Sequence, residues 1–380
     1  RAGMEGLVGY LDDELEERAF GKMIKDPKRT FRANSGWIGI THQYWLTSII
    51  PPQEGEKTFR FLHNGGTKKS PGRFQVDYVG SGVRVAPGET AEAVTRVFAG
   101  AKKLELLEHY EEIHDIRHFD LAVDFGLWYF MTKPLFHVLN YLGSLTGNFG
   151  IAIIIVTILM RLAVFPLANT SYRSFAKMKQ ISPKMKELRE KFGDDKTKLQ
   201  QELVALYERE KVNPMAGCFP ILIQIPIFFA LFKVLSISIE MRHAPFYGWI
   251  NDLSVKDPTS IFNLFGLIPW QPPEFMMIGI WPCIMLLAML AQRRMNPPPQ
   301  DPIQAGMADM MPFVMTYILS GFAAGLVIYW TFSNILSVLL QYVIMRSMGV
   351  EVHFLRRDKE DVEMKEMVRK GPSVHPELEV

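Results

Sequence analysis

The sequence has few of the residues on which redox, metal and nucleic-acid-binding proteins depend. Its 380 residues include two cysteines, Cys218 and Cys283, and both lie in apolar runs. Two cysteines provide neither a disulfide framework nor a four-ligand metal site, and they indicate no redox compartment. The formal net charge of +2 is too small to indicate a nucleic-acid-binding protein. Because the chain begins at Arg1 with no signal-like segment, we expect that an upstream targeting or anchoring piece is missing.

Recognisable catalytic motifs are also absent from the sequence. It contains no paired His/Glu metalloprotease motif, no Gly-rich phosphate loop and no nucleophile elbow. His114 and His118 lie one helical turn apart in a charged stretch, which is compatible with a metal site, but we favour a solvated helix face because no further ligand set stands out. We therefore predict no catalytic residue, no metal and no cofactor.

Long apolar runs are what the sequence does contain. Crossing about 30 Å of hydrocarbon takes about 20 apolar residues in a helix. Five runs between residues 147 and 345 approach that length, too many for the core of one soluble domain. We predict an α-helical polytopic membrane protein with five transmembrane helices, at residues 147–169, 214–240, 274–293, 307–323 and 324–345.

Lys and Arg in the connecting segments predict the orientation. Eleven of these residues lie in 170–213, whereas the segment 241–273 holds only Arg242 and Lys256. Since cytoplasmic loops carry the excess of positive charge, 170–213, 294–306 and the tail 346–380 are predicted to be cytoplasmic. The segment 241–273 and residues 1–118 are then predicted to lie outside.

Residues 1–146, which are predicted to lie outside or at the outer interface, contain a strand-rich part and a helical part. Within 1–118, RFQVDYVG (73–80) alternates with period two, AEAVTRVFAG (91–100) is a second candidate strand, and 36–50 predicts a strand pair, so we expect a β-sandwich fragment. The stretch 119–146 is rich in aromatics but broken by polar residues. It predicts an amphipathic helix lying in the outer interface, with a sixth, kinked span as the alternative.

The basic segment 170–213 predicts a cytoplasmic helical hairpin. Apolar residues recur at spacings of three and four in two stretches, 171–192 and 196–212, separated by Gly193-Asp194-Asp195. Two helices with facing apolar stripes form an antiparallel hairpin. A docking role and a plain connector both fit it, and its candidate functional residues are Lys184, Asp194 and Asp195.

Arg161 is the residue on which the functional reading depends. A charged side chain near the centre of a span costs roughly 2.5–3.5 kcal/mol, so it normally faces a polar cavity or a partner. Thr157 lies one turn earlier on the same face, and we see no acidic residue within the spans to neutralise Arg161. Snorkelling towards the cytoplasm is the alternative. Other spans offer candidate groove residues: Gln224, Tyr329, Trp330, Ser333, Asn334 and Gln341.

Five segments of this sequence resemble the YidC insertases, the bacterial relatives of the Oxa and Alb proteins. They are IIIVTILMRLAVFPL (153–167), EKVNPMAGCFPILIQIPIFFAL (210–231), MNPPPQDPIQAGMADMMP (295–312), GLVIYWTFSNILSVLLQ (325–341) and, for the outer domain of Gram-negative members, GWIGITHQYWLTSIIPP (36–52). The motifs occur in the family's order over nearly the whole chain.

The resemblance implies a function, a location and partners. It implies an inner-membrane insertase and chaperone with a periplasmic β-sandwich and a missing N-terminal span. Nascent membrane proteins would enter a groove that is open to cytoplasm and lipid, holds Arg161, and releases them into the bilayer. It also implies the lipid bilayer, the Sec translocase, the ribosome and the signal recognition particle receptor as partners, with no direct nucleic-acid binding.

Some positions depart from the family pattern, and two rival functions stay open. Trp330 stands where relatives often carry a second Tyr, and the acidic residues after Arg357 argue against a basic ribosome-binding tail. A small-molecule transporter would use Arg161 as an anion site, but we find no internal repeat. A structural assembly factor docked to a larger translocase is the other rival.

Overall fold

The computed structural model describes residues 3–65, 72–192, 195–213, 219–296 and 302–350. Asp194, Cys218 and the predicted tail beyond 350 lie outside these residues. The chain divides into two compact units: Arg1–His137 with Phe229–His243, and Val138–Phe228 with Ala244–Val380. Each unit is described by itself.

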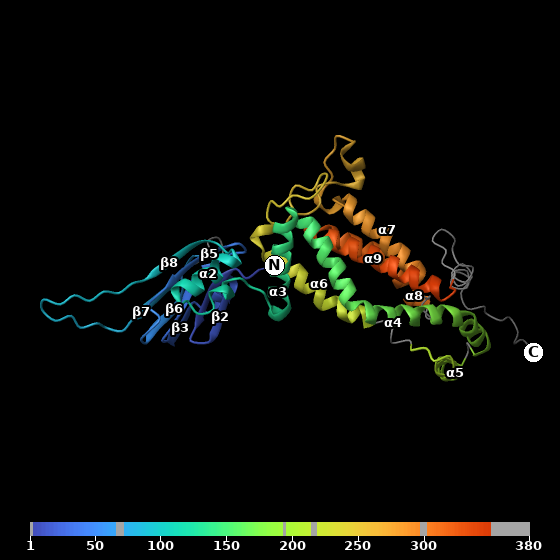
Figure 1. The fold of residues 1–380 in the computed structure, drawn as a ribbon, viewed down its shortest axis with the longest axis horizontal. Coiled ribbons are helices and arrows are strands. Elements are labelled where there is room, and N and C mark those ends of the chain that lie inside the picture. Colours follow the sequence, from blue (N-terminus) through green and yellow to red (C-terminus); the bar gives the residue numbers. More distant parts are fainter. Residues whose placement is uncertain (1–2, 66–71, 193–194, 214–218, 297–301, 351–380) are drawn as a thin grey trace, which may run out of the picture. The chain divides into compact units, whose positions relative to one another are not determined.

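The described part of the first unit contains eight strands in two antiparallel sheets (Figure 1). The larger sheet has the order β2-β1-β4-β5-β8, and the smaller has the order β3-β6-β7. The strands are β1 (Gly6–Leu11), β2 (Glu14–Ala19), β3 (Lys28–Ala33), β4 (Gly36–Thr41), β5 (Trp45–Ile50), β6 (Lys57–Asn64), β7 (Arg73–Gly80) and β8 (Arg96–Ala101).

The two sheets share one apolar core. Side chains from the larger sheet, such as Leu7 and Ile38, meet Phe59 and Phe61 of the smaller sheet, and all four are fully buried. Successive residues of a strand point to opposite faces, so alternate positions of β6 enter this core. This is the facing-sheet arrangement of a β-sandwich.

The strands agree with the sequence pattern in two places and differ in one. The alternating run 73–80 is β7, and 36–50 forms the pair β4 and β5. The run predicted as a strand over 91–100 becomes one only from Arg96, as β8. Its first half has no strand partner among the described residues, because β5 ends its pairing with β8 at Ile50 and Arg96.

Helices connect and complete the first unit. They are α1 (Phe20–Lys25), α2 (Leu104–His114), the short η1 (Phe119–Ala122) and α3 (Tyr129–Thr146), which continues into the second unit. Along α3 the exposed side chains of Phe130, Val138, Tyr141 and Leu145 recur at helical spacing, so one face of this helix is apolar and exposed.

The second unit is helical. Its helices are α4 (Phe149–Phe192), α5 (Lys196–Arg209), α6 (Phe219–Ile237, shared with the first unit from Phe229), α7 (Ile280–Met295), α8 (Pro302–Ser320) and α9 (Ala324–Ser347). Short 3-10 turns occur at Ile239–Met241, Ile261–Gly266 and Glu274–Met276. Helix α9 packs against both α4 and α7, and α8 packs on α7 (Figure 1).

Helix α4 runs without a break through the predicted boundary between span and hairpin at residue 169. It has 44 residues, about 66 Å at 1.5 Å per residue, which is twice the thickness of the hydrocarbon. Pro166 and Pro183 lie inside it without ending it. The change from an apolar to an amphipathic pattern therefore marks where the surroundings change, not where the helix ends.

Two of the described helices, α4 and α9, are long and apolar enough to cross a membrane. Within α6, the stretch Gln224–Ile237 is a shorter apolar helix.

Candidate functional site

Arg161 lies in the apolar first half of α4. It is the thirteenth residue of the helix, about 18 Å from its first residue. Thr157 lies one turn earlier and is buried, with its hydroxyl donating to the Ile153 carbonyl at 2.7 Å. That hydroxyl needs no partner from another helix, so Thr157 can sit in an apolar setting beside the arginine.

The partner of Arg161 is the hydroxyl of Ser333 on α9, to which the guanidinium donates a hydrogen bond. Among the described residues, no carboxylate lies within ion-pair distance of Arg161. This agrees with the expectation that no acidic residue of the spans neutralises Arg161. Asp309 does lie in α8, within the predicted span 307–323, but its carboxylate is 3.2 Å from Arg293 on α7.

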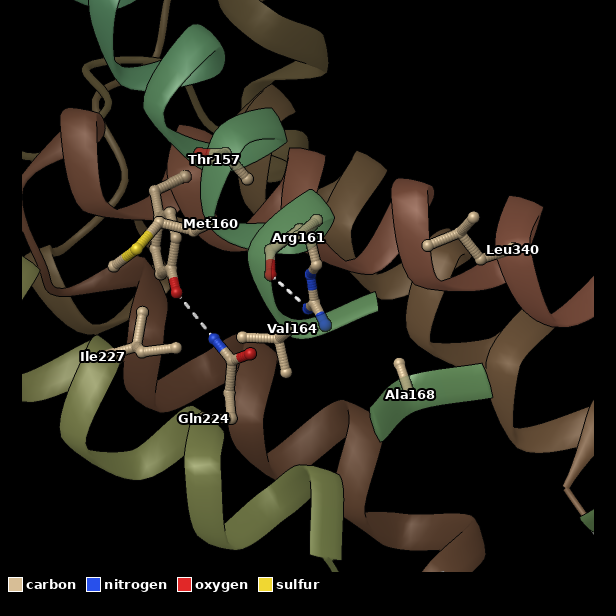
Figure 2. Close-up of a pocket in the computed structure, with 10 residues that line it drawn as sticks. Thr157, Met160, Arg161, Val164, Ala168, Gln224, Ile227 and Leu340 are labelled. Carbon is tan, nitrogen blue, oxygen red and sulfur yellow. Dashed lines mark hydrogen bonds between the residues drawn. The ribbon is translucent and has the colours of Figure 1, made fainter. Parts of the chain in front are cut away.

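A second polar contact joins α6 to α9 beside the arginine. The Gln224 amide donates to the Tyr329 hydroxyl at 2.6 Å, and Tyr329 is buried (Figure 2). One turn of α9 separates Tyr329 from Ser333, so α9 supplies an oxygen to Gln224 at one level and to Arg161 at the next.

These contacts surround a cavity between α4, α6 and α9 with a volume of about 460 Å³, its mouth included. Figure 2 shows Arg161 and Gln224 reaching into the same space from two helices. The other lining residues are Thr157, Met160, Val164, Ala168, Ile227, Tyr329, Ser333 and Leu340. Five of the predicted groove residues, Arg161, Thr157, Gln224, Tyr329 and Ser333, thus lie together.

Trp330 and Asn334, also predicted for the groove, do not line the cavity. Each follows a lining residue by one position, which turns its side chain about 100° around the helix. The Trp330 ring packs edge-on against Phe228 with centroids 4.9 Å apart. The Trp330 Nε1 and the Asn334 Nδ2 are buried and have no hydrogen-bond partner in the part of the chain that the structure describes.

Gln341, the last polar residue predicted for this face, is fully buried and donates to the Asn296 side chain at 3.0 Å. It belongs to the contact between α9 and the end of α7, not to the cavity.

The apolar wall of the cavity was missed in the sequence. Met160, Val164 and Ala168 lie on the face of α4 that carries Thr157 and Arg161, at spacings of three and four. Extending the polar stripe by its helical period would have found them. Ile227 and Leu340 gave no such signal, because one face of an apolar helix resembles another.

The hairpin residues take structural positions. Lys184 forms an ion pair with Glu210 at 2.6 Å, which joins the end of α4 to the end of α5. Asp195 caps α5, its side chain accepting from the Lys198 amide at 3.1 Å. Asp194 lies outside the described residues.

The predicted histidine pair is not brought together as a metal site. His114 stacks on Tyr110, whereas potential ligand atoms of Glu111, His118 and Asp120 lie within 4.8 Å of one another. The Lys133 ammonium lies 2.6 Å from Asp120 and already balances its charge. Burial lowers the pKa of Lys133, but hydrogen bonds to the carboxylates of Asp120 and Glu108 outweigh it and raise the pKa overall, so this ammonium stays charged.

Comparison with known families divides the chain within α3. The family described as "60Kd inner membrane protein" matches residues 141–351, and that described as "YidC periplasmic domain" matches residues 2–138. A solved structure described as an active YidC insertase with its first transmembrane domain resolved is 19% identical. The match covers 89% of this chain and 83% of that one, with a TM-score of 0.47.

Curated relatives named "Membrane protein insertase YidC" match most of the chain. Those of Brucella suis and Sinorhizobium medicae are 50% identical over 92% of this chain, and that of Rickettsia conorii is 48% identical over 90%. The aligned part spans 57% to 60% of these relatives' length. The chain belongs to the YidC membrane protein insertase family of inner-membrane proteins with a periplasmic domain.

Proposed function

We propose that this chain is a membrane protein insertase and chaperone that works by binding and release, without a chemical step. The observation that supports this most directly is the Arg161 guanidinium, which faces a cavity between apolar helices and has a hydroxyl, not a carboxylate, as its partner. A cation in such a place costs free energy unless an anionic or polar group binds beside it. That group belongs to the leading segment of a nascent membrane protein.

The lining of the cavity suggests what part of the guest it takes. Arg161, Gln224 and Ser333 offer polar groups to the same space that Val164 and Ile227 line with apolar side chains. The cavity accepts a short polar or acidic segment, while the apolar helix of the guest stays outside against α4 and α9. From there the guest leaves into lipid, and the transmembrane potential contributes about 2.3 kcal/mol per charge per 100 mV.

The proposed architecture has five spans, α4, α6, α7, α8 and α9, with the basic hairpin of 170–213 in the cytoplasm. Lys and Arg in the loops support this orientation by the positive-inside rule. The first unit's sheets then lie in the periplasm, and the exposed apolar stripe of α3 suits a helix in the outer interface.

We propose nascent membrane proteins and the bilayer as the direct partners, and the Sec translocase, the ribosome and the signal recognition particle receptor as assembly partners. The hairpin is the docking surface we assign to the cytoplasmic partners, because it carries eleven Lys and Arg. Lys184 stays among its proposed contact residues, because its side chain is 57% exposed although it pairs with Glu210.

Arg161→Ala tests the electrostatic part of this function. Purified protein in proteoliposomes is given a short single-span substrate with an acidic N-terminal tail, and insertion is read by protease protection of the tail. Losing about 1.4 kcal/mol of stabilisation slows insertion about tenfold. Arg161→Lys keeps the charge and retains most of the rate.

Arg173→Ala is the matched control, because Arg173 lies on the same helix, is exposed, and bonds the Asn169 side chain. It is expected to insert the substrate normally. Normal insertion by Arg161→Ala would exclude the electrostatic role, and uptake of a small anion into vesicles would move the assignment to a transporter.

A further inference from the structure

The loop that precedes α7 has the chemistry of a lipid-embedded segment. Residues 261–273, which we call the apolar loop, contain no charged side chain. Seven of their large apolar side chains are 42% to 83% exposed: Ile261, Phe262, Leu264, Phe265, Leu267, Ile268 and Trp270. Loops in water carry polar side chains on such a surface, and contiguous exposed apolar residues mark an interaction site.

The backbone of the apolar loop is hydrogen-bonded within the loop and to its base. The amide of Phe265 donates to the Ser260 carbonyl at 2.8 Å, and the amide of Ile268 donates to the Asn263 carbonyl at 3.1 Å. The Asn263 side chain accepts from the Gly266 amide and donates to the Trp270 carbonyl. Internal pairing of backbone groups is what residence in hydrocarbon requires, because no water is there to pair with them.

The conformation of the loop tip points the same way. Leu264 and Phe265 have φ angles of +49° and +58°, a left-handed region that bulky residues rarely adopt. The side chains of both residues are exposed, so packing within the protein does not offset this strain. An apolar environment outside the protein would do so.

A rigid base joins the apolar loop to α7. Asp257 is buried, and its carboxylate accepts hydrogen bonds from Thr259 and from the Trp281 amide in the first turn of α7. Ser260 is also buried, and its hydroxyl donates to the Met276 carbonyl at 2.9 Å. In Figure 1 the segment leading into α7 projects beyond the first turn of that helix. The loop is therefore held at the start of α7.

Helix α7 is short for a span. Its 16 residues rise about 24 Å, some 6 Å less than the hydrocarbon thickness. The segment at its start must supply the remaining apolar surface. Lys256 and Glu274, whose charged groups lie 3.5 Å apart, bracket the apolar loop and mark where charge resumes.

We propose that the apolar loop is inserted into the outer leaflet of the bilayer, where lipid acyl chains cover its exposed side chains. This agrees with the outer side that the charge pattern predicts for 241–273 and adds that part of the segment enters the bilayer. The inference rests on the proposed membrane embedding of α7 but not on the insertase activity.

Spin labels in lipid nanodiscs test this proposal. Both native cysteines are replaced by Ala in the full chain, and a nitroxide is attached at Leu267→Cys. The lipid control is Leu287→Cys on α7, whose side chain is 67% exposed, and the water control is Val83→Cys in the first unit, 70% exposed. The measurement is accessibility to oxygen, which partitions into lipid, against accessibility to a water-soluble nickel chelate.

The label at Leu267 is expected to have the high oxygen-to-nickel ratio of Leu287. A ratio like that of Val83 would place the loop in water and overturn the proposal while leaving the insertase assignment intact. Exclusion of both reagents would overturn it as well, because protein would then cover the loop. Leu264→Cys repeats the measurement if the Leu267 variant does not fold.

Discussion

Arg161 and Lys102 are two cations in different surroundings, since Arg161 lines a cavity and Lys102 is buried. Arg161 lines a cavity and bonds one hydroxyl, so a guest can reach its charge. Lys102, between β8 and α2, is only 5% exposed, and its ammonium donates to the Thr41 hydroxyl at 2.9 Å. Burial lowers the pKa of Lys102 to about 8, although the nearby Asp124 carboxylate opposes this.

The low pKa of Lys102 predicts how the stability of the first unit depends on pH. Below pH 8 Lys102 is protonated in both the folded and the unfolded state, and burial of its charge lowers the free energy of unfolding by the full amount. Between about pH 8 and 10.5 the unfolded chain binds more protons than the fold, so stability rises with pH.

Lys102→Met is expected to stabilise the first unit at pH 7 and to abolish the rise above pH 8. The difference between a pKa of about 8 and the ordinary 10.5 means that the buried charge lowers the free energy of unfolding by about 3 kcal/mol. Removing the charge recovers this stability, less about 1 kcal/mol for the lost hydrogen bond to Thr41. Thermal unfolding of the full chain at pH 7 and pH 9.5 measures both effects. The exposed Lys103→Met is the control, and a destabilised Lys102→Met at pH 7 would show that the charge is needed where it lies.

At the scale of the element, the cytoplasmic hairpin holds itself together. Ile181 and Met185 of α4 form an apolar cluster with Leu203, Leu206 and Val212, and the Lys184–Glu210 pair lies beside it. The cluster is small, so each member matters for keeping α5 against α4.

Leu203→Ala is expected to loosen α5 from α4. Removing a buried Leu side chain costs about 2–3 kcal/mol at a site that partly collapses. Limited proteolysis within 195–213 should accelerate, whereas Val204→Ala, at a position 50% exposed, should leave the cleavage rate unchanged. Equal cleavage of the two variants would mean that the stripe does not hold the hairpin.

Elements were predictable where their signal is local. The period-two run 73–80 and the apolar stripe over 178–206 each depend on side chains a few residues apart, and both appear as predicted. The continuity of α4 through residue 169 was not predictable, because helix propensity does not change there. The charge pattern predicts only the side of the membrane for 241–273, because the rule applied to it counts Lys and Arg and ignores exposed apolar side chains.

The residues of the cavity were predictable where a single helix carries the signal. Arg161 and Thr157 stand out because polar residues are rare in apolar runs. Trp330 and Asn334 stand out equally, yet they lie outside the cavity because helix rotation is decided by packing between helices. The pairing of Asp309 with Arg293 is also a contact between helices, invisible in either helix alone.

At the scale of the whole molecule, the proposed function requires that a nascent membrane protein occupies the cavity between α4, α6 and α9. Every residue that lines the cavity belongs to the second, helical unit. The proposed binding therefore belongs to that unit, whatever the sheets contribute.

Site-specific photo-crosslinking tests that claim most directly. A photoreactive side chain replaces Val164 or Ile227, which line the cavity from α4 and α6, and Leu287 on α7 serves as the control outside it. Each variant is presented with a ribosome stalled on a short membrane protein. We expect crosslinks to the nascent chain from Val164 and Ile227 and none from Leu287. If the protein is folded and the ribosome is engaged, the absence of crosslinks from both cavity positions would show that the nascent chain does not occupy the cavity.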